Sequence, residues 1–438
     1  MPQPLQNPTD RLLSIDTFRG AVIFIMLFVN MVAMLGDLPI VGEWMGSAPV
    51  SIFRHASCSY DPPVWLADVD NDAEKCFWRG GKIVSINDNQ CEIAIQPLTD
   101  SESVSTEVLP LAKLETPKPL RDGTPVIVKR NPATHELLRV QAKDNGCTIC
   151  DWVAPFFVFI VGVCIPLSRK YRREQWLGHV GKRTLALLGL GFLDMSLGAG
   201  LSYWWGILQS IAIAYCVAAL VVSFSGKTRF FLVLILGAIH LFMTQEFSWW
   251  TFVGNPDVPP FSINTLDGDL LRPLNAHCTP WAGLGYVLVA IIGTLVGDSF
   301  GTRDIHIILK RTLLATACPF IIMGTLLMFL QPMSKEEVTT SYAFFTAGVA
   351  AAILALFYLT IDVWKHKYWT RLFTVFGVNP LLAFILQPFL RMTFEKLGLL
   401  QLYHNHAGPE AIAWGLAWVM TVWIIVLFCN KKGWYWKV

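Results

Sequence analysis

The stretch NGCTICDWVAPFFVFIVG (145–162) passes from a polar turn into an apolar run, and the interpretation of the whole chain depends on it. Its natural beginning, FRHAS (53–57), lies far upstream, because residues 58–144 separate the two fragments. The separating residues alternate like strands, whereas the sequence on both sides is typical of membrane helices. His55 therefore stands where a transmembrane helix opens into a loop that holds an inserted domain. This position indicates chemistry at a membrane surface.

The composition indicates a polytopic membrane protein. The chain has 438 residues, of which 54% are hydrophobic and 15% charged, and its mean hydropathy is +0.48. That balance is too apolar for a soluble protein of this length. The net charge of +2 gives no reason to expect a nucleic-acid partner. The first apolar run is long enough to span a bilayer, so we expect it to act as its own insertion signal.

Apolar runs of about twenty residues, the length that crosses the hydrocarbon core, recur along the chain. They predict ten transmembrane helices, at roughly 15–35, 149–168, 180–198, 203–223, 229–246, 278–297, 311–331, 340–361, 371–393 and 410–430. The predicted fold class is an all-α polytopic membrane protein with a small inserted all-β domain.

The charges of the loops predict the orientation. Lys and Arg gather in alternate connections and in the tail: Arg169, Lys170, Arg172, Arg173, Lys182, Arg183, Lys227, Arg229, Arg303, Lys310, Arg311, Lys365, Lys367, Arg371, Lys431, Lys432 and Lys437. The other connections are poor in them, with only Arg272 in 247–277 and only Lys335 in 332–339. The positive-inside rule then places both termini in the cytoplasm, and His55 and residues 58–144 outside it.

Residues 58–144 are predicted to form a small antiparallel sheet or barrel, because they contain four runs with period-two alternation (81–86, 91–95, 125–129 and 136–140). Turn signals separate these runs. We divide the chain into an N-terminal helix and catalytic loop (1–57), an inserted β domain (58–144) and the remaining helix bundle (145–438). Outside the cytoplasm, disulfides among Cys58, Cys76, Cys91 and Cys147 could form, in a pairing that the spacing leaves open. No metal site is expected, since the Cys147–Cys150 pair has no second pair nearby.

Polar side chains inside apolar helices are costly, so each is a candidate for function. Asp16 and Arg19 share one helical face and form either an ion pair or a polar anchor beneath a cavity. Asn30, Gln209 and Asn379 could line that cavity or join helices by hydrogen bonds. Asp151 could orient an imidazole or cap its own helix. Alone, these positions suit an enzyme or a transporter.

At these residues the chain resembles the heparan-α-glucosaminide N-acetyltransferase family, the lysosomal transmembrane acetyltransferases and their bacterial relatives. The motifs that carry the resemblance are RLLSIDTFRG (11–20), LFVN (27–30), RHAS (54–57) and NGCTICDWVAPFFVFIVG (145–162). Weaker similarity follows at GILQSIA (206–212), SYAF (341–344) and GVN (377–379). The chain departs from the family in the insertion 58–144 and in lacking a large outer domain before the first helix. The resemblance therefore implies a bacterial-type relative whose acceptor need not be heparan sulfate.

The resemblance implies a helix bundle that takes acetyl-CoA from the cytoplasm and acetylates an amino sugar, or a sugar hydroxyl, of a glycan on the other side. Carried over by motif, His55 is the catalytic histidine, as general base or as transient nucleophile, with Asn30 and Asp151 beside it. We expect the acetyl-CoA cosubstrate to contact the following residues: Asp16, Arg19, Arg172, Arg173, Gln209 and Asn379. The expected location is a bacterial inner membrane with the catalytic loop in the periplasm.

Two other functions fit the same sequence. A transporter or flippase for a glycan or lipid-linked precursor would line its path with the same polar groups. A scaffold would present the insertion to a partner. The expected partners are membrane lipid and the extracytoplasmic acceptor, and the sequence leaves the oligomeric state open, a homodimer included.

Overall fold

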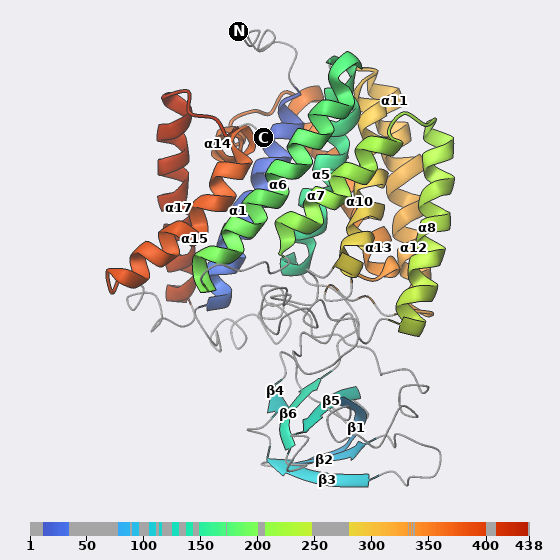
Figure 1. Ribbon diagram of the computed structural model, residues 1–438, viewed down its shortest axis with the longest axis vertical. Helices are drawn as coiled ribbons and strands as arrows, with labels where there is room; N and C mark the ends of the chain where they lie inside the picture. The colour runs from blue at the N-terminus through green and yellow to red at the C-terminus, as the bar shows by residue number, and fades with distance from the viewer. Residues whose placement is uncertain are drawn as a thin grey trace.

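The computed structural model describes residues 12–34, 78–87, 90–95, 105–110, 114–115, 125–130, 137–142, 149–171, 173–199, 206–247, 280–331, 333, 335, 338–399 and 409–436. Most of these residues form a bundle of helices, and the remainder form a sheet drawn beyond one end of the bundle (Figure 1). All structural statements below concern these residues.

The bundle consists of helices that run alternately up and down in Figure 1. In chain order they are α1 (Leu13–Met34), α5 (Ile149–Tyr171), α6 (Trp176–Ala199), α7 (Ile207–Val221), α8 (Gly226–Phe247), α10 (Pro280–Phe300), α11 (Ile305–Leu309), α12 (Cys318–Leu327), α13 (Thr340–Phe357), α14 (Thr370–Val378), α15 (Pro380–Lys396) and α17 (Pro409–Lys431). A 3₁₀ turn, Arg173–Gln175, precedes α6. Two π-helical segments, Lys310–Ala317 and Tyr358–Val363, precede α12 and follow α13.

Helix occupies each of the ten predicted regions, but the described residues do not confirm ten membrane spans. Seven helical stretches among the described residues are long and apolar enough to cross a bilayer, or eight if a bent pair is counted. α7 has 15 residues and is short for a span, and α6 does not meet the same test of length and hydropathy. The predicted helix 371–393 is broken, because α14 and α15 meet at 84°.

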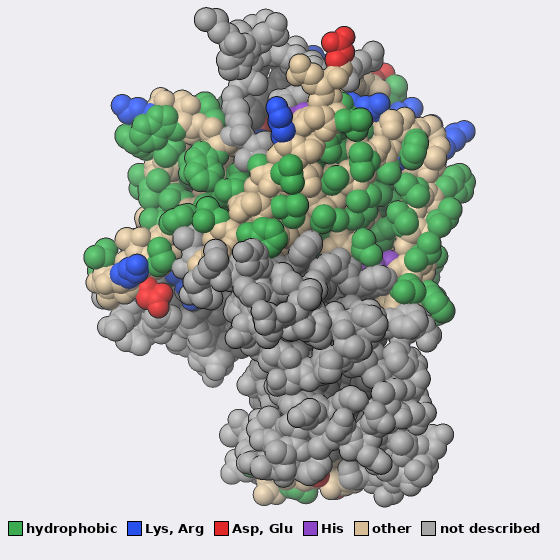
Figure 2. Space-filling model, in the orientation of Figure 1, with side chains coloured by type: hydrophobic (Ala, Val, Ile, Leu, Met, Phe, Trp, Pro, Cys, Tyr) green, Lys and Arg blue, Asp and Glu red, His purple; other side chains and the backbone are tan. Residues whose placement is uncertain are grey.

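The outer surface of the bundle is apolar where a bilayer would surround it. On α8, Phe231, Ile235, Ile239 and Phe242 recur at helical spacing, and each is more than half exposed. Figure 2 shows hydrophobic side chains across the middle of the visible face, with Lys and Arg concentrated along one end. Apolar surface of this extent is unusual in soluble monomers and indicates a lipid-facing surface.

We call the two ends of the bundle the basic end and the opposite end. The basic end is where α5, α7, α10 and α17 finish and where α6, α8, α11 and α14 start. Its described Lys and Arg are Arg169, Lys170, Lys182, Arg183, Lys227, Arg229, Arg303, Lys310, Arg311, Lys365, Lys367, Arg371, Lys431 and Lys432. At the opposite end α1 finishes, α5, α10 and α13 begin, and the sheet lies beyond them (Figure 1).

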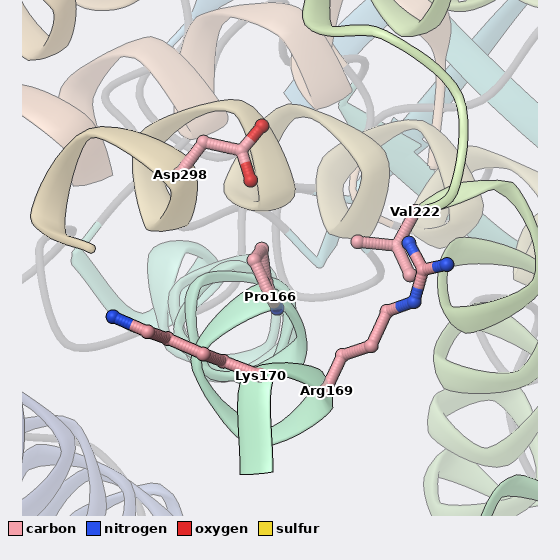
Figure 3. Close-up of a pocket in the computed structure, with 5 residues that line it drawn as sticks. All are labelled: Pro166, Arg169, Lys170, Val222 and Asp298. Carbon is pink, nitrogen blue, oxygen red and sulfur yellow. The ribbon is translucent and has the colours of Figure 1, made fainter. Parts of the chain in front are cut away.

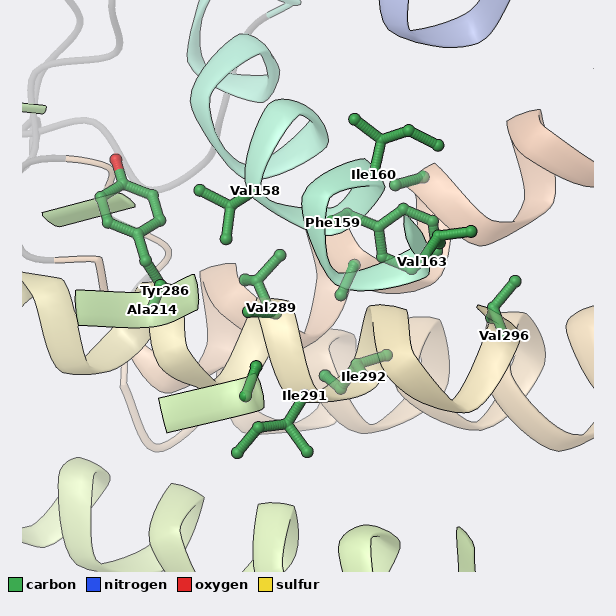
Figure 4. Packing of buried hydrophobic residues seen from close by; sticks show 14 of the residues in the cluster. Val158, Phe159, Ile160, Val163, Ala214, Tyr286, Val289, Ile291, Ile292 and Val296 are labelled. Atoms are coloured by element: carbon green, nitrogen blue, oxygen red, sulfur yellow. The ribbon is translucent and has the colours of Figure 1, made fainter. Parts of the chain in front are cut away.

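Two apolar cores hold the bundle together, and α1 contributes to both. The larger core joins α5, α7, α10 and α13, and Figure 4 shows side chains of α5 interleaving with those of α10. The smaller core joins α14, α15 and α17 to the second half of α1, through residues such as Met26, Leu27 and Trp418. Ile15, Phe18 and Val22 of α1 belong to the larger core, so α1 connects the two groups of helices.

Glycines let the helices touch at their backbones. A Cβ on Gly162 of α5 would collide with the Ala290 carbonyl of α10, and one on Gly293 would collide with the Phe159 carbonyl. α1 and α14 meet in the same way, because a Cβ on Gly377 would collide with the Asp16 carbonyl oxygen. Small residues at such contacts are typical of helix packing in membranes, where close van der Waals contact drives association.

The sheet has six strands in the order β3-β2-β1-β5-β6-β4. The strands are β1 (Trp78–Asn87), β2 (Gln90–Ile95), β3 (Ser105–Pro110), β4 (Leu114–Glu115), β5 (Pro125–Arg130) and β6 (Leu137–Ala142). All pairings are antiparallel except that of β4 with β6. Ile83, Cys91, Ile93 and Leu109 are buried while Val84 and Val108 are exposed, as period-two alternation requires. Strands therefore lie inside the predicted insertion, although its boundaries at 58 and 144 fall outside the described residues.

The contact between α1 and α14 leads to a test. Replacing Gly377 with Ala should lower the stability of the bundle by about 1–3 kcal/mol, because the added methyl group has no space beside the Asp16 carbonyl. The matched control is Gly189→Ala on α6, where a new Cβ would meet nothing within 4 Å. Thermal unfolding of the detergent-solubilised protein measures both variants. A Gly377→Ala variant as stable as the parent would contradict the close contact.

Candidate functional site

A pocket opens at the basic end of the bundle, between the last turns of α5 and α10 and the residue that follows α7. Its volume is about 500 Å³, and it is lined by Pro166, Arg169, Lys170, Val222 and Asp298. Figure 3 shows Arg169 extending toward Val222 and Lys170 extending to the other side of α5, with Asp298 on the neighbouring α10. We call it the inner pocket. Its size suits a small-molecule ligand, and its two cationic side chains favour an anionic one.

A buried arginine supports the wall of the inner pocket. Arg229, at the start of α8, is only 2% exposed and forms an ion pair with Asp298. Its other nitrogens donate to Thr294 Oγ1 at 2.6 Å and to the Phe224 carbonyl at 3.2 Å. Asp298 is thereby held on the wall of the pocket, and its charge is balanced without using Arg169 or Lys170.

The opposite end holds a second group of polar residues, which we call the outer polar cluster. Its members lie at the start of α5 and at the approach to α13, and all are buried: Asp151, Gln331, Lys335, Thr339, Thr340, Ser341 and Tyr342. The Tyr342 hydroxyl donates to the backbone carbonyl of Asp151 and fastens α13 to the first turn of α5. Polar side chains at this density inside an apolar bundle mark a candidate site.

Hydrogen bonds organise the outer polar cluster around the first residue of α13. The Thr340 N–H donates to Gln331 Oε1 at 2.9 Å, and the Thr340 hydroxyl lies 3.0 Å from Nδ1 of His240 on α8. Thr339 caps α13 by accepting from the Tyr342 N–H. Gln331 Nε2 is buried and has no hydrogen-bond partner among the described residues. This amide is therefore a group that a bound molecule could satisfy.

The structure gives Asp16 and Arg19 contacts within the protein. Arg19 Nη2 lies 2.8 Å from Asp16 Oδ1 and also donates to the Gly377 carbonyl of α14. The pair therefore joins α1 to α14 at their backbone contact. Neither residue lines the inner pocket. Their predicted contact with acetyl-CoA stays a prediction.

Gln209 and Asn379 also have partners within the chain. Gln209 Oε1 accepts the Gly206 N–H at 3.0 Å and caps the start of α7. Asn379 stands at the break between α14 and α15, where its amide donates to the Trp434 carbonyl at 2.8 Å and its oxygen accepts the Trp436 N–H at 3.2 Å. These contacts give Gln209 and Asn379 a structural role. The predicted role of both residues in cofactor binding also stays a prediction.

Of the predicted catalytic residues, Asn30 and Asp151 lie in the described part of the chain. Asn30 is exposed near the end of α1, and its amide donates to Gln387 Oε1 of α15 at 3.2 Å. Asp151 is fully buried. His55 and Arg172 lie outside the described residues, and of Arg173 only the backbone is described. Among the described residues, the contact of Asn30 is with Gln387, and the predicted grouping of Asn30 and Asp151 with His55 stays a prediction.

Sequence reasoning singles out Arg169, Lys170 and Asp151 but misses other residues that the structure places at the two sites. It treats Lys335 only as a loop charge and does not identify Asp298. The signal for Asp298 was available, because an acid near the end of an apolar helix needs a buried cation. Gln331 carried no comparable signal, since a polar residue beside a loop is ordinarily solvated, and Tyr342 entered only through the weak similarity at SYAF (341–344).

Comparison with known proteins does not assign the chain to a family. No protein-family model matches the chain, and no curated protein matches it significantly. In the part of the chain that the structure describes, no group of three His, Cys, Asp or Glu side chains could hold a metal ion.

The contacts of Asn379 lead to a prediction that separates structure from cofactor binding. Asn379→Ala removes hydrogen bonds to Asn430, Trp434 and Trp436 and should destabilise the protein by roughly 1–3 kcal/mol. The affinity for CoA, measured by isothermal titration calorimetry below the unfolding temperature, should not change. Asn30→Ala, which removes one exposed hydrogen bond, is the control for stability. Loss of CoA affinity without loss of stability would instead place Asn379 in the cofactor site.

Proposed function

We propose that this chain is a membrane-embedded acyltransferase that moves an acetyl group from cytoplasmic acetyl-CoA to an amino sugar, or a sugar hydroxyl, of a glycan on the other side of the membrane. The observation that carries the proposal is the inner pocket, where Arg169 and Lys170 flank about 500 Å³ of space at the basic end of an apolar bundle. The nucleotide of CoA is polyanionic, and a pocket with two cations facing the cytoplasm suits it.

The orientation of the proposed enzyme follows from its charges. Described Lys and Arg side chains concentrate at the basic end, which the positive-inside rule assigns to the cytoplasm. The opposite end, with the outer polar cluster and the sheet, then faces the periplasm of a bacterial inner membrane. In this orientation the donor and the acceptor approach from different sides.

α5 supports the proposal because it reaches both sites. It carries Asp151 near its first turn and Arg169 and Lys170 in its last. The pantetheine arm of CoA is long and fairly apolar, so it suits a path along the bundle between the inner pocket and the outer polar cluster. The thioester would then meet the acceptor near Asp151 and the loop that bears His55.

The proposed chemistry needs one proton acceptor. The acceptor amine or hydroxyl attacks the thioester carbonyl, a C–N or C–O bond forms, and the C–S bond breaks to release CoA. His55 takes the proton from the acceptor and returns it to the leaving thiolate. In the alternative sequence of steps, the imidazole itself attacks the thioester and passes the acetyl group on. Asn30 would hold the thioester carbonyl or the imidazole.

One observation favours the second candidate function, a transporter or flippase for a glycan or lipid-linked precursor. α14 and α15 form a broken helix with an 84° bend at Asn379, and discontinuous helices frequently form substrate sites in transporters. The Asn379 side chain is occupied by the chain's own tail. That occupancy weakens the transporter reading relative to the acyltransferase.

The inner pocket provides the first test. Replacing Arg169 and Lys170 together with Gln should weaken CoA binding roughly tenfold or more and make the affinity less sensitive to salt, because two charge-assisted contacts are lost. Lys310→Gln with Arg311→Gln is the matched control, since this adjacent exposed pair lies at the same end and does not line the pocket. Titration calorimetry at low and high salt measures both variants. Equal losses in the two pairs would show a general charge effect and remove the pocket from the proposal.

His55 provides the second test, which separates an enzyme from a transporter. His55→Ala should lower acetyl transfer by roughly 10²–10⁴-fold, the usual contribution of a positioned acid–base group. CoA affinity should remain near that of the parent, because the nucleotide binds at the basic end. Transfer is followed with radiolabelled acetyl-CoA and an amino-sugar acceptor in proteoliposomes. Activity within a few-fold of the parent would exclude His55 from the reaction.

A further inference from the structure

The inner pocket has an acidic residue on its wall, which a site for a simple anion would not need. Arg169 and Lys170 contribute two cations to the lining, and Asp298 contributes a carboxylate. Figure 3 shows these three charged side chains around Pro166. A carboxylate repels a second anion and forms hydrogen bonds only as an acceptor. The combination therefore indicates a ligand that has both negative charge and hydrogen-bond donors.

The backbone contact between α5 and α10 places Asp298 at this pocket. Gly297, the residue before it, lies against α5, because a Cβ there would collide with the Val163 carbonyl oxygen. At this point α10 passes the last turns of α5 with no side chain of Gly297 between them. The next side chain along α10 is that of Asp298, and it lines the pocket together with Pro166 of α5.

Arg229 fixes the direction of the Asp298 carboxylate. Its guanidinium forms an ion pair with Asp298 Oδ2, and its other nitrogens donate to Thr294 Oγ1 and the Phe224 carbonyl. The Thr294 hydroxyl donates to the Ile291 carbonyl at 2.6 Å, so its oxygen serves Arg229 as an acceptor. An arginine held by three partners in this way keeps one oxygen of the carboxylate in place.

The rest of the Asp298 carboxylate is available to a ligand. The Asp298 side chain is 38% exposed, whereas that of its partner Arg229 is 2% exposed. Within the described part of the chain, the contact with Arg229 is the one hydrogen bond recorded for the Asp298 carboxylate. An ionised carboxylate has about four acceptor positions, so most of them remain unused. They belong to a side chain that lines the inner pocket.

We propose that Asp298 is a specificity-determining residue, which accepts a hydrogen bond from a hydroxyl or amino group of the ligand while Arg169 and Lys170 bind its phosphates. The inner pocket then prefers a nucleotide, which has both kinds of group, to a bare phosphate anion. The identification of this nucleotide with that of CoA rests on the proposed acyltransferase function. The preference itself follows from the lining of the pocket and does not depend on the reaction.

ADP and inorganic pyrophosphate test this preference, because both contain a diphosphate and only ADP has sugar hydroxyls and an amino group. Titration calorimetry of the detergent-solubilised full chain should show that ADP binds at least about tenfold tighter than pyrophosphate. In Asp298→Asn the ratio of the two affinities should fall roughly tenfold, since a charge-assisted hydrogen bond becomes a weaker neutral one. The loss of the negative charge itself favours both diphosphates alike. The apolar contacts of Pro166 and Val222 are the same in both proteins.

Asp304→Asn is the matched control. It removes a negative charge at the basic end, from an exposed helix cap that does not line the pocket. Its ratio of affinities should stay within about twofold of the parent, because exposed charges at a distance are screened.

Two results would overturn the proposal. One is equal affinity of the parent for ADP and pyrophosphate, a measurement that needs no variant to fold. The other is an unchanged ratio in Asp298→Asn, because an Asp298 that only holds Arg229 would shift both affinities alike. A parent protein that prefers ADP to pyrophosphate, loses this preference in Asp298→Asn and does not bind CoA would support the role of Asp298 and reject the acyltransferase.

Discussion

The close approach of α5 and α10 is the contact on which the rest of the bundle depends. At Gly162 and Gly293 the two helices touch without intervening side chains, and the larger core packs around that line. The pair also fixes the separation of the two sites. Asp151 and Arg169 lie on one helix that rises about 1.5 Å per residue, so they are roughly 27 Å apart. A nucleotide in the inner pocket can therefore serve chemistry near Asp151 only through an extended arm that runs along the bundle.

Hydropathy predicted most of the helical part of the fold, because a bilayer accepts only long apolar segments whose backbone is satisfied internally. Alternation likewise predicted β1, β2, β5 and β6, and in β1 and β2 it matches the burial of Ile83, Cys91 and Ile93. It missed β3, whose residues Thr106, Val108 and Pro110 are exposed around the buried Leu109. It also missed that α14 ends at Val378. Asn379-Pro380 gave a local signal for a break, but a local signal does not set the 84° angle at which the two helices meet before both pack against α17.

The candidate sites were harder to predict than the fold, because the role of each residue depends on partners that are distant in the sequence. Asp298 is held by Arg229, which belongs to another helix. Lys335 is buried in a turn where Val338 adopts a left-handed conformation, and no pattern in the sequence requires that conformation. Conversely, Gln209 and Arg19 stood out as polar residues in apolar helices, and both have partners in the fold. A polar residue inside an apolar helix thus marks a candidate position, but its polarity does not predict whether its role is structural or functional.

The attachment of Asn379 to residues that follow α17 also bears on how the protein is made. The two groups that hold its side chain most directly are the Trp434 carbonyl and the Trp436 N–H. The junction of α14 and α15 therefore cannot reach its final geometry until α17 and the residues after it have been synthesised, although earlier parts of a chain usually fold first. Before that point Asn379 lacks these partners. The insertion machinery must accommodate an incompletely packed helix pair, and the assembly of this half of the bundle waits for α17.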